Sequence, residues 1–246
     1  MGFLLSRRWV LFALAVTVLA VGSWWLGEWQ FDRLEERQRA NARVERNLEL
    51  EPVPVAEVLE VGRAVDESDE WRRIRAVGVY EQDQSVIVRY QTRDGASGVD
   101  VVTPLKLAAT GAALLVDRGW LATDNAGSTD VEVPAAPAGT VTVVGWVRAD
   151  ATGDSVEVAD QSTRAISSVA VGEALGEPVY GGFVDLVEEQ PAPAQPLTKA
   201  EPPDLGQGPH FFYGLQWWFF AALAVFGFGY LAFDERRKAQ LSVDQA

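Results

Sequence analysis

Two long stretches without a charged residue do most to limit how this chain folds. The first runs from Trp9 to Gly27 and the second from Phe211 to Phe233, which is 19 and 23 residues. As α-helices they would rise about 28 and 34 Å, against a hydrocarbon core of about 30 Å in a lipid bilayer. Each stretch is therefore long enough to cross a membrane.

A cleaved signal peptide is the alternative interpretation of the first stretch. Arg7 and Arg8 precede an apolar run with small residues near Ala20, as in a signal peptide. The run is long for that role, however, and it continues to Trp29, where tryptophans are typical of a membrane interface. We therefore predict a retained transmembrane helix over residues 9–29.

Basic residues predict the orientation of the two helices. They lie before the first helix, within residues 1–8, and after the second, within residues 234–246. By the positive-inside rule both termini are cytoplasmic, in a multi-pass protein of the cell (inner or plasma) membrane. The arginines that follow the first helix oppose this orientation, but acidic residues alternate with them. A long outer domain also crosses the membrane largely regardless of charge.

The rest of the chain divides by composition. Arginine and acidic residues at helical spacing extend the first helix, and six prolines lie between Gln190 and Pro209. The predicted segments are a cytoplasmic N-terminus (1–8), a transmembrane helix (9–29), a charged helical extension (30–50), an extracytoplasmic β-rich domain (51–189), a proline-rich linker (190–209), a second transmembrane helix (210–233) and a cytoplasmic tail (234–246).

Within the central domain the hydrophobic period changes to the alternation of β-strands. Six strands are predicted, at residues 71–80, 85–92, 99–107, 113–121, 140–148 and 179–187. Short helices are expected at residues 55–65 and 168–175, and a proline-, alanine- and glycine-rich loop at 125–139. The predicted fold class is a membrane-anchored α+β protein. Its two transmembrane helices flank a mainly antiparallel β-domain, either a barrel or a sandwich.

Composition excludes several functions. The chain has no cysteine, one histidine and one methionine, which rules out disulfides, thiolate metal centres, cysteine nucleophiles and copper relay through soft ligands. A net charge of −14 argues against nucleic acid as a partner. A Ser–His–Asp arrangement would need His210, which stands at the mouth of the second helix, and no glycine-rich phosphate loop occurs. We therefore predict that the protein is not an enzyme.

The outer ends of the two membrane helices hold the candidate functional residues. Trp29 and Arg33 share a face of the first helix, and His210, Tyr213 and Trp217 share a face of the second. Because the helices run in opposite directions, both groups fall at the same membrane depth. An aromatic belt with arginines that reach the interface explains the tryptophans, but it explains Gln30, Gln216 and His210 less well. Ionisable groups at this depth are costly unless they are partnered or used.

Four motifs resemble one known family. They are LGEWQFDR at 26–33, GVDVVTP at 98–104, LVDRGWL at 115–121 and GPHFFYGLQWWFFA at 208–221. Their order and spacing, with a helix at each end, are similar to those of the surfeit locus protein 1 family, the cytochrome c oxidase assembly factors. The resemblance spans essentially the whole chain.

The resemblance implies an assembly factor for a haem–copper cytochrome c oxidase that holds haem a or inserts it into the catalytic subunit. Its implied partners are cytochrome c oxidase subunits and the haem a delivery machinery, besides membrane lipid. His210 matches the family's histidine implicated as a haem iron ligand. Two alternatives remain: a structural scaffold or accessory subunit without haem, and an unrelated extracytoplasmic sensor or solute-binding domain.

A haem site needs an imidazole, an apolar surface and cations for the propionates. We expect His210 to supply the imidazole, and Trp29, Tyr213 and Trp217 to line the haem. Arg33, or alternatively Arg37 one turn further on, would meet the propionates. We expect Arg118, Gly119 and Trp120 in the third motif to be structural, as a strand that ends in a bulge with a core tryptophan.

Overall fold

The computed structural model describes residues 2–124, 127 and 131–244. The chain divides into two compact units, one made of Met1–Ala42 and Leu205–Ala246 and the other of Arg43–Asp204. In the loop predicted at 125–139, residues 125, 126 and 128–130 lie outside the described residues. The last two residues of the predicted tail lie outside them as well.

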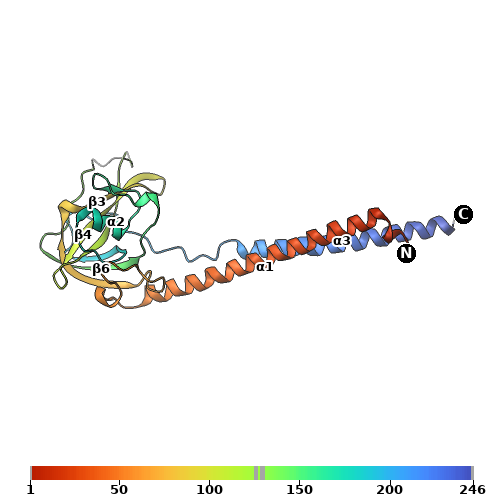
Figure 1. The fold of residues 1–246 in the computed structure, drawn as a ribbon, viewed down its shortest axis with the longest axis horizontal. Helices are drawn as coiled ribbons and strands as arrows, with labels where there is room; N and C mark the ends of the chain where they lie inside the picture. Colours follow the sequence, from red (N-terminus) through yellow and green to blue (C-terminus); the bar gives the residue numbers. More distant parts are fainter. Residues whose placement is uncertain (1, 125–126, 128–130, 245–246) are drawn as a thin grey trace. The chain divides into compact units, whose positions relative to one another are not determined.

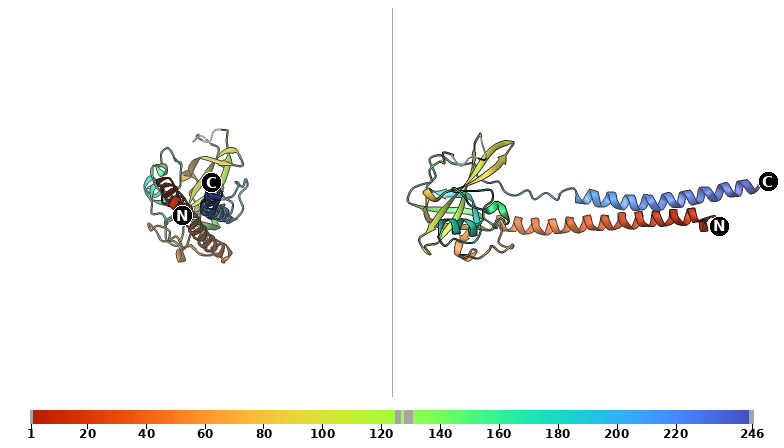
Figure 2. Two further views of the ribbon diagram at one scale, coloured as in Figure 1. Left: turned by 90° about the vertical axis from the view of Figure 1, so that its right-hand side faces the viewer. Right: turned by 45° about the horizontal axis from the view of Figure 1, so that its top comes forward.

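The first unit consists of two long helices that run antiparallel. A 3₁₀ turn, η1 (Gly2–Leu5), precedes α1 (Arg7–Glu49), and α3 (His210–Asp244) runs alongside α1 in the opposite direction (Figures 1 and 2). The predicted membrane span and its charged extension therefore form one continuous helix of 43 residues. Both helices are long and apolar enough to cross a membrane, and only 6% of the most apolar stretch of each is buried within the protein.

Two glycines let the helices approach closely. A Cβ atom on Gly27 of α1 would overlap the indole of Trp218, and one on Gly214 of α3 would lie 2.8 Å from the Phe31 ring. The Phe31 and Trp218 rings are 4.8 Å apart between centroids. Each helix thus inserts an aromatic ring over a glycine of the other, which is a typical way for apolar helices to associate.

The chain that enters α3 is fixed to α1. Asn41 donates a 2.6 Å hydrogen bond from Nδ2 to the Leu205 carbonyl, and Arg37 donates from Nε to the Gly206 carbonyl. These bonds restrict the position of the segment just before His210.

The second unit is a small β-barrel. Its strands are β1 (Val53–Pro54), β2 (Arg73–Tyr80), β3 (Val86–Arg93), β4 (Ala96–Leu107), β5 (Ala113–Ala122), β6 (Thr140–Arg148), β7 (Ser162–Thr163) and β8 (Phe183–Gln190). The sheet order is β1-β2-β6-β8-β5-β4-β3-β7, and β2 pairs a second time, with β4. That pairing closes β2, β6, β8, β5 and β4 into a ring, so the barrel alternative is confirmed.

The mainly antiparallel arrangement is confirmed as well. The pairings β2–β4, β2–β6, β3–β4, β4–β5 and β6–β8 are antiparallel. The β5–β8 pairing is parallel, and so are the two short pairings β1–β2 and β3–β7. The six predicted strands all form, with ends displaced by at most four residues.

The short helices were predicted with mixed success. α2 (Ser168–Leu175) is confirmed, between the N-cap Ser167, whose side chain accepts from the Ala170 N–H, and the left-handed C-cap Gly176. The helix predicted at 55–65 is wrong beyond the 3₁₀ turn η2 (Val55–Glu57). Val61 forms a β-bridge with Tyr180 instead, a tertiary pairing that the local pattern does not reveal.

The barrel has apolar residues on both sides of its central strands. The interior is filled mainly by Ile74, Leu105, Leu114, Val116, Val141, Val143, Val184 and Leu186. A second cluster lies outside β4 and β5, beneath α2 and β3, and includes Val86, Val88, Val102, Leu115, Ile166, Val171 and Phe183. This double burial explains the nearly continuous apolar runs of β4 and β5. Two further 3₁₀ turns, η3 (Gln82–Gln84) and η4 (Asp154–Val156), lie in the connections.

Part of the predicted linker belongs to the barrel. Residues 197–199, here called the strap, lie along β5, where Trp120 and Thr198 exchange backbone hydrogen bonds of 2.7 and 3.1 Å. Arg93 donates to the carbonyl oxygens of Thr198 and Lys199 at 3.3 and 3.0 Å. The strap fills the edge that β5 leaves open beyond its short pairing with β8.

Gly119 makes this contact possible. Its φ of +128° is one that other residues rarely adopt, and a Cβ atom there would lie 2.5 Å from the Thr198 carbonyl oxygen. We expect Gly119→Ala to destabilise the full-length protein by about 2 kcal/mol, from backbone strain and loss of the strap. We also expect trypsin to cleave faster after Lys199. Thermal unfolding in detergent and timed proteolysis measure both effects.

Gly111→Ala is the matched control. Gly111 also has a positive φ, +70°, but a Cβ atom there would meet nothing within 4 Å. This variant should lose about 1 kcal/mol from strain alone and leave cleavage after Lys199 unchanged. Equal proteolysis in both variants would show that Gly119 does not hold the strap.

Candidate functional site

The helix unit brings a histidine and a glutamine together. His210 is the first residue of α3, and its Nδ1 lies 2.8 Å from Oε1 of Gln30 on α1. Both side chains are half-buried. His210 Nε2 has no hydrogen-bond partner among the residues that the structure describes. The contact with Gln30 thus fixes the imidazole through Nδ1.

Two aromatic residues share the helix face of His210. Tyr213 and Trp217 follow it by three and seven residues, which places all three side chains along one side of α3. Tyr213 is 48% exposed and Trp217 is half-buried. On the side of α3 that carries His210, the helix therefore presents two partly exposed aromatic side chains.

Trp29 and Arg33 form a separate group. Trp29 follows Gly27 by two residues, roughly 200° around α1 from the side that meets α3. The Arg33 guanidinium lies 5.7 Å from the Trp29 ring centroid and makes a 2.7 Å ion pair with Glu36. The structure thus brings together His210, Tyr213 and Trp217, while Trp29 and Arg33 contact each other instead.

Sequence reasoning singled out Gln30 but did not pair it with His210. Gln30 follows Gly27 by three residues and precedes Arg37 by seven, so all three lie on the side of α1 that meets α3. The spacing from Gly27 was the available signal, but it requires knowing that Gly27 is a helix contact. Of the two arginines considered for the propionates, Arg37 is the one on that side.

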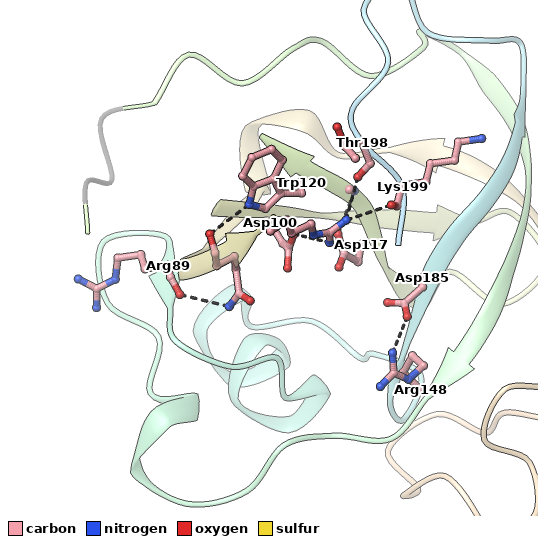
Figure 3. A network of polar contacts seen from close by, with 11 residues as sticks. Arg89, Asp100, Asp117, Trp120, Arg148, Asp185, Thr198 and Lys199 are labelled. Carbon is pink, nitrogen blue, oxygen red and sulfur yellow. Dashed lines mark hydrogen bonds and ion pairs between the residues drawn. The ribbon is translucent and has the colours of Figure 1, made fainter. Parts of the chain in front are cut away.

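The barrel holds a second polar cluster. Asp100 of β4, Asp117 of β5 and Asp185 of β8 lie on neighbouring strands and point toward one region (Figure 3). Arg93 pairs with Asp100 at 2.8 Å and Arg148 pairs with Asp185 at 2.6 Å. We call these five residues the carboxylate cluster.

Asp117 differs from the other two aspartates. It is only 5% exposed, its Oδ1 accepts a 2.9 Å hydrogen bond from the Gly119 N–H, and the described residues give it no ion pair. Burial, and then the charges of Asp100 and Asp185, hold the pKa of Asp117 well above its usual range. Burial also raises the pKa of Asp100 and of Asp185, against the effect of their arginines.

The carboxylate cluster borders an open cavity of about 490 Å³. Within the described ranges, no group of three or more histidine, aspartate or glutamate side chains is arranged to hold a metal ion. Asp100 and Asp117 belong to two of the motifs in the sequence, yet sequence reasoning did not pair them, because only strand register brings them together. Their position indicates a role in the barrel itself.

Arg118 also has a structural role. It donates hydrogen bonds to the carbonyl oxygens of Pro134 and Ala135 at 3.0 and 3.2 Å, and its guanidinium lies 5.6 Å from the Tyr80 ring centroid. The neighbouring Trp120 donates from Nε1 to the Gln91 carbonyl at 3.1 Å. These contacts are structural, but the predicted core tryptophan is wrong, because Trp120 is half-buried and β5 continues beyond it to Ala122.

The fold and the helix site define a class of protein, in which a small β-barrel domain is inserted in the sequence between two long apolar helices. The chain belongs to the SURF1 family, whose sequence model matches residues 17–222.

Relatives agree with this assignment. An uncharacterized SURF1-like protein of Mycobacterium tuberculosis (strain ATCC 25618 / H37Rv) is 30% identical over 243 residues, which cover 96% of this chain and 88% of the relative. A SURF1-like protein of Monosiga brevicollis is 33% identical over 118 residues, 44% of this chain and 42% of that protein. The cytochrome oxidase assembly protein SHY1 of Saccharomyces cerevisiae is 28% identical over 99 residues, 40% of this chain and 25% of that protein.

The protonation of Asp117 predicts a pH effect on stability. Because its pKa is raised in the folded protein, folding favours the protonated acid. Stability is therefore lost as the pH rises above the ordinary aspartate value of about 4. Asp117→Asn imitates the neutral acid, so we expect it to be more stable than the wild type at pH 8 by about 1 kcal/mol or more. The advantage should shrink toward pH 5, as measured by unfolding of the full-length protein.

Asp83→Asn serves as the control, because Asp83 is exposed in η3. This variant should follow the wild type at both pH values. If Asp117→Asn is destabilised equally at pH 5 and pH 8, Asp117 is charged in the folded protein and the burial argument fails.

Proposed function

We propose that the protein is an assembly factor for a haem–copper cytochrome c oxidase and holds haem a for the catalytic subunit. The observation that carries the haem part is the single histidine of the chain, with Nδ1 bonded to Gln30 and Nε2 available. Membership of the SURF1 family and the likeness to SHY1, named as a cytochrome oxidase assembly protein, support the assembly role. On this proposal the protein binds and transfers, and catalyses no reaction.

The residues around His210 suit a haem. A bound haem a would supply an iron that an imidazole nitrogen can ligate. His210 offers Nε2 for that purpose, and Tyr213 and Trp217 offer aromatic surface on the same side of α3. Arg37, on the side of α1 that carries Gln30, is the better placed cation for the propionates. The roles predicted for Trp29 and Arg33 stay predictions.

We further propose that α1 and α3 span the cell membrane with both termini in the cytoplasm and the barrel domain outside. The exposed apolar surface of both helices supports the spanning role. Arg7 and Arg8 before one span, and Arg236, Arg237 and Lys238 after the other, support the orientation. Packing of Gly27 and Phe31 against α3 argues that α1 is retained and not removed as a signal peptide.

Haem content of purified protein tests the haem proposal. Full-length wild type and His210→Ala are purified in mild detergent from cells that make haem a, with Gln216→Ala as a matched control on the same turns of α3. We expect haem absorption in the wild type and control, and at least a tenfold loss in His210→Ala. Haem retained in all three would move the ligand elsewhere and overturn the assignment of His210.

A haem-free scaffold that stabilises oxidase intermediates is the second candidate. The observation in its favour is the exposed apolar surface of the helices, which suits packing against other membrane helices. A scaffold would retain oxidase subunits without His210, but would lose them when Gly214→Leu separates α1 from α3. Absence of haem from every preparation, with oxidase subunits still bound, would favour this candidate.

The absence of cysteine makes the orientation easy to test. Ser6→Cys places a thiol before α1, and Asp83→Cys places one on the exposed surface of the barrel unit. We expect a membrane-impermeant maleimide to label Asp83→Cys in intact cells, and Ser6→Cys only after the membrane is opened. The reverse pattern would show that the barrel domain is cytoplasmic.

A further inference from the structure

We propose that Gln30 is a positioning residue that holds His210 in one tautomer and leaves Nε2 free to bind a ligand. The inference rests on the proposed function only in taking His210 as the ligand. Nothing in the family match or in the relatives' names assigns a role to Gln30.

The structure identifies which imidazole nitrogen of His210 contacts Gln30. Gln30 Oε1 lies 2.8 Å from Nδ1, a normal hydrogen-bond length, while Nε2 has no partner among the described residues. The structure turns the oxygen of the Gln30 amide toward Nδ1, and in that orientation the oxygen accepts and Nδ1 carries the hydrogen. In the neutral ring the lone pair is then on Nε2.

The contact between α1 and α3 fixes the position of Gln30 relative to His210. Gln30 lies one turn beyond Gly27 and next to Phe31, the residues at which α1 meets α3. Those contacts set the distance between the helices, and therefore the distance from the amide to the ring. On the α3 side, a Cβ atom on Gly208 would already touch the His210 ring at 3.4 Å, so the ring also has a close neighbour in the preceding chain.

The chemistry of histidine ligands explains why this matters. A ligating imidazole usually donates its other N–H to an acceptor, which fixes the tautomer and the ring orientation and makes the ligating nitrogen more basic. Loss of such an acceptor typically lowers affinity by about 10–100-fold. Gln30 is such an acceptor, supplied by the other helix. A glutamine that only bridges two helices would affect stability but not the tautomer.

The single histidine allows a direct measurement. Full-length protein labelled with ¹⁵N-histidine, without haem and in detergent micelles, gives one imidazole spin system, and its two-bond ¹H–¹⁵N pattern reports the tautomer of the neutral ring. We expect Nδ1–H in the wild type. Gln30→Leu should shift the ring to Nε2–H, the form that a free neutral histidine prefers, whereas Gln30→Glu keeps an acceptor oxygen and should keep Nδ1–H.

Gln216→Leu is the control, because Gln216 lies on the same part of α3 and is not the partner of His210. It should leave the pattern unchanged. Circular dichroism confirms that each variant keeps its helices. An Nε2–H wild type, or an identical pattern in the wild type and Gln30→Leu, would overturn the proposal.

Titration with haemin then connects the tautomer to binding. We expect Gln30→Leu to weaken haemin binding by about 10–100-fold, and Gln30→Glu to restore it. If the wild type binds no haemin but the tautomer responds to Gln30 as expected, the proposed haem function fails while the positioning role of Gln30 stands. If haemin binds equally to the wild type and Gln30→Leu, the positioning role fails while the haem function stands.

Discussion

The close contact between Gly27 and Gly214 is the constraint on which the candidate site depends. With no side chain on either residue, the Trp218 indole fits over one glycine and the Phe31 ring fits over the other. This brings the helix backbones near enough for a side chain as short as glutamine to bridge them. The hydrogen bond between Gln30 and His210 is therefore a consequence of how closely the two helices pack.

The family motif that lies in β5 of the barrel domain consists of residues with structural roles. Within one short stretch of β5, Asp117 accepts from the Gly119 N–H, Arg118 holds the carbonyls of a loop, and Gly119 and Trp120 receive the strap. Arg93, itself part of the carboxylate cluster, connects the strap to Asp100, since it contacts both the strap carbonyls and that carboxylate. These residues form a connected hydrogen-bond network in the second unit, so the most distinctive residues of this motif stabilise the fold.

Much of the fold was predictable because its signals are local. Alternation of apolar and polar residues located the six strands of the barrel ring and its edge, and the length of the uncharged stretches located α1 and α3. The helix expected at 55–65 failed because Val61 pairs with Tyr180, far away in the sequence. The strap was missed for the same reason, because a proline-rich composition predicts an extended chain but not the strand edge that it joins.

By itself, the sequence determined the two apolar helices and the strand-rich domain between them. Its resemblance to a known family pointed to the one histidine of the chain as the candidate ligand. Composition and hydrophobic periodicity can be read directly from the sequence, because they depend only on the order of residues along the chain. Only the tertiary structure decided that Gln30 is the partner of His210, that Trp29 and Arg33 lie elsewhere, and that three aspartates share one region of the barrel. Helix rotation and strand register set these proximities, and both depend on contacts between residues distant in sequence.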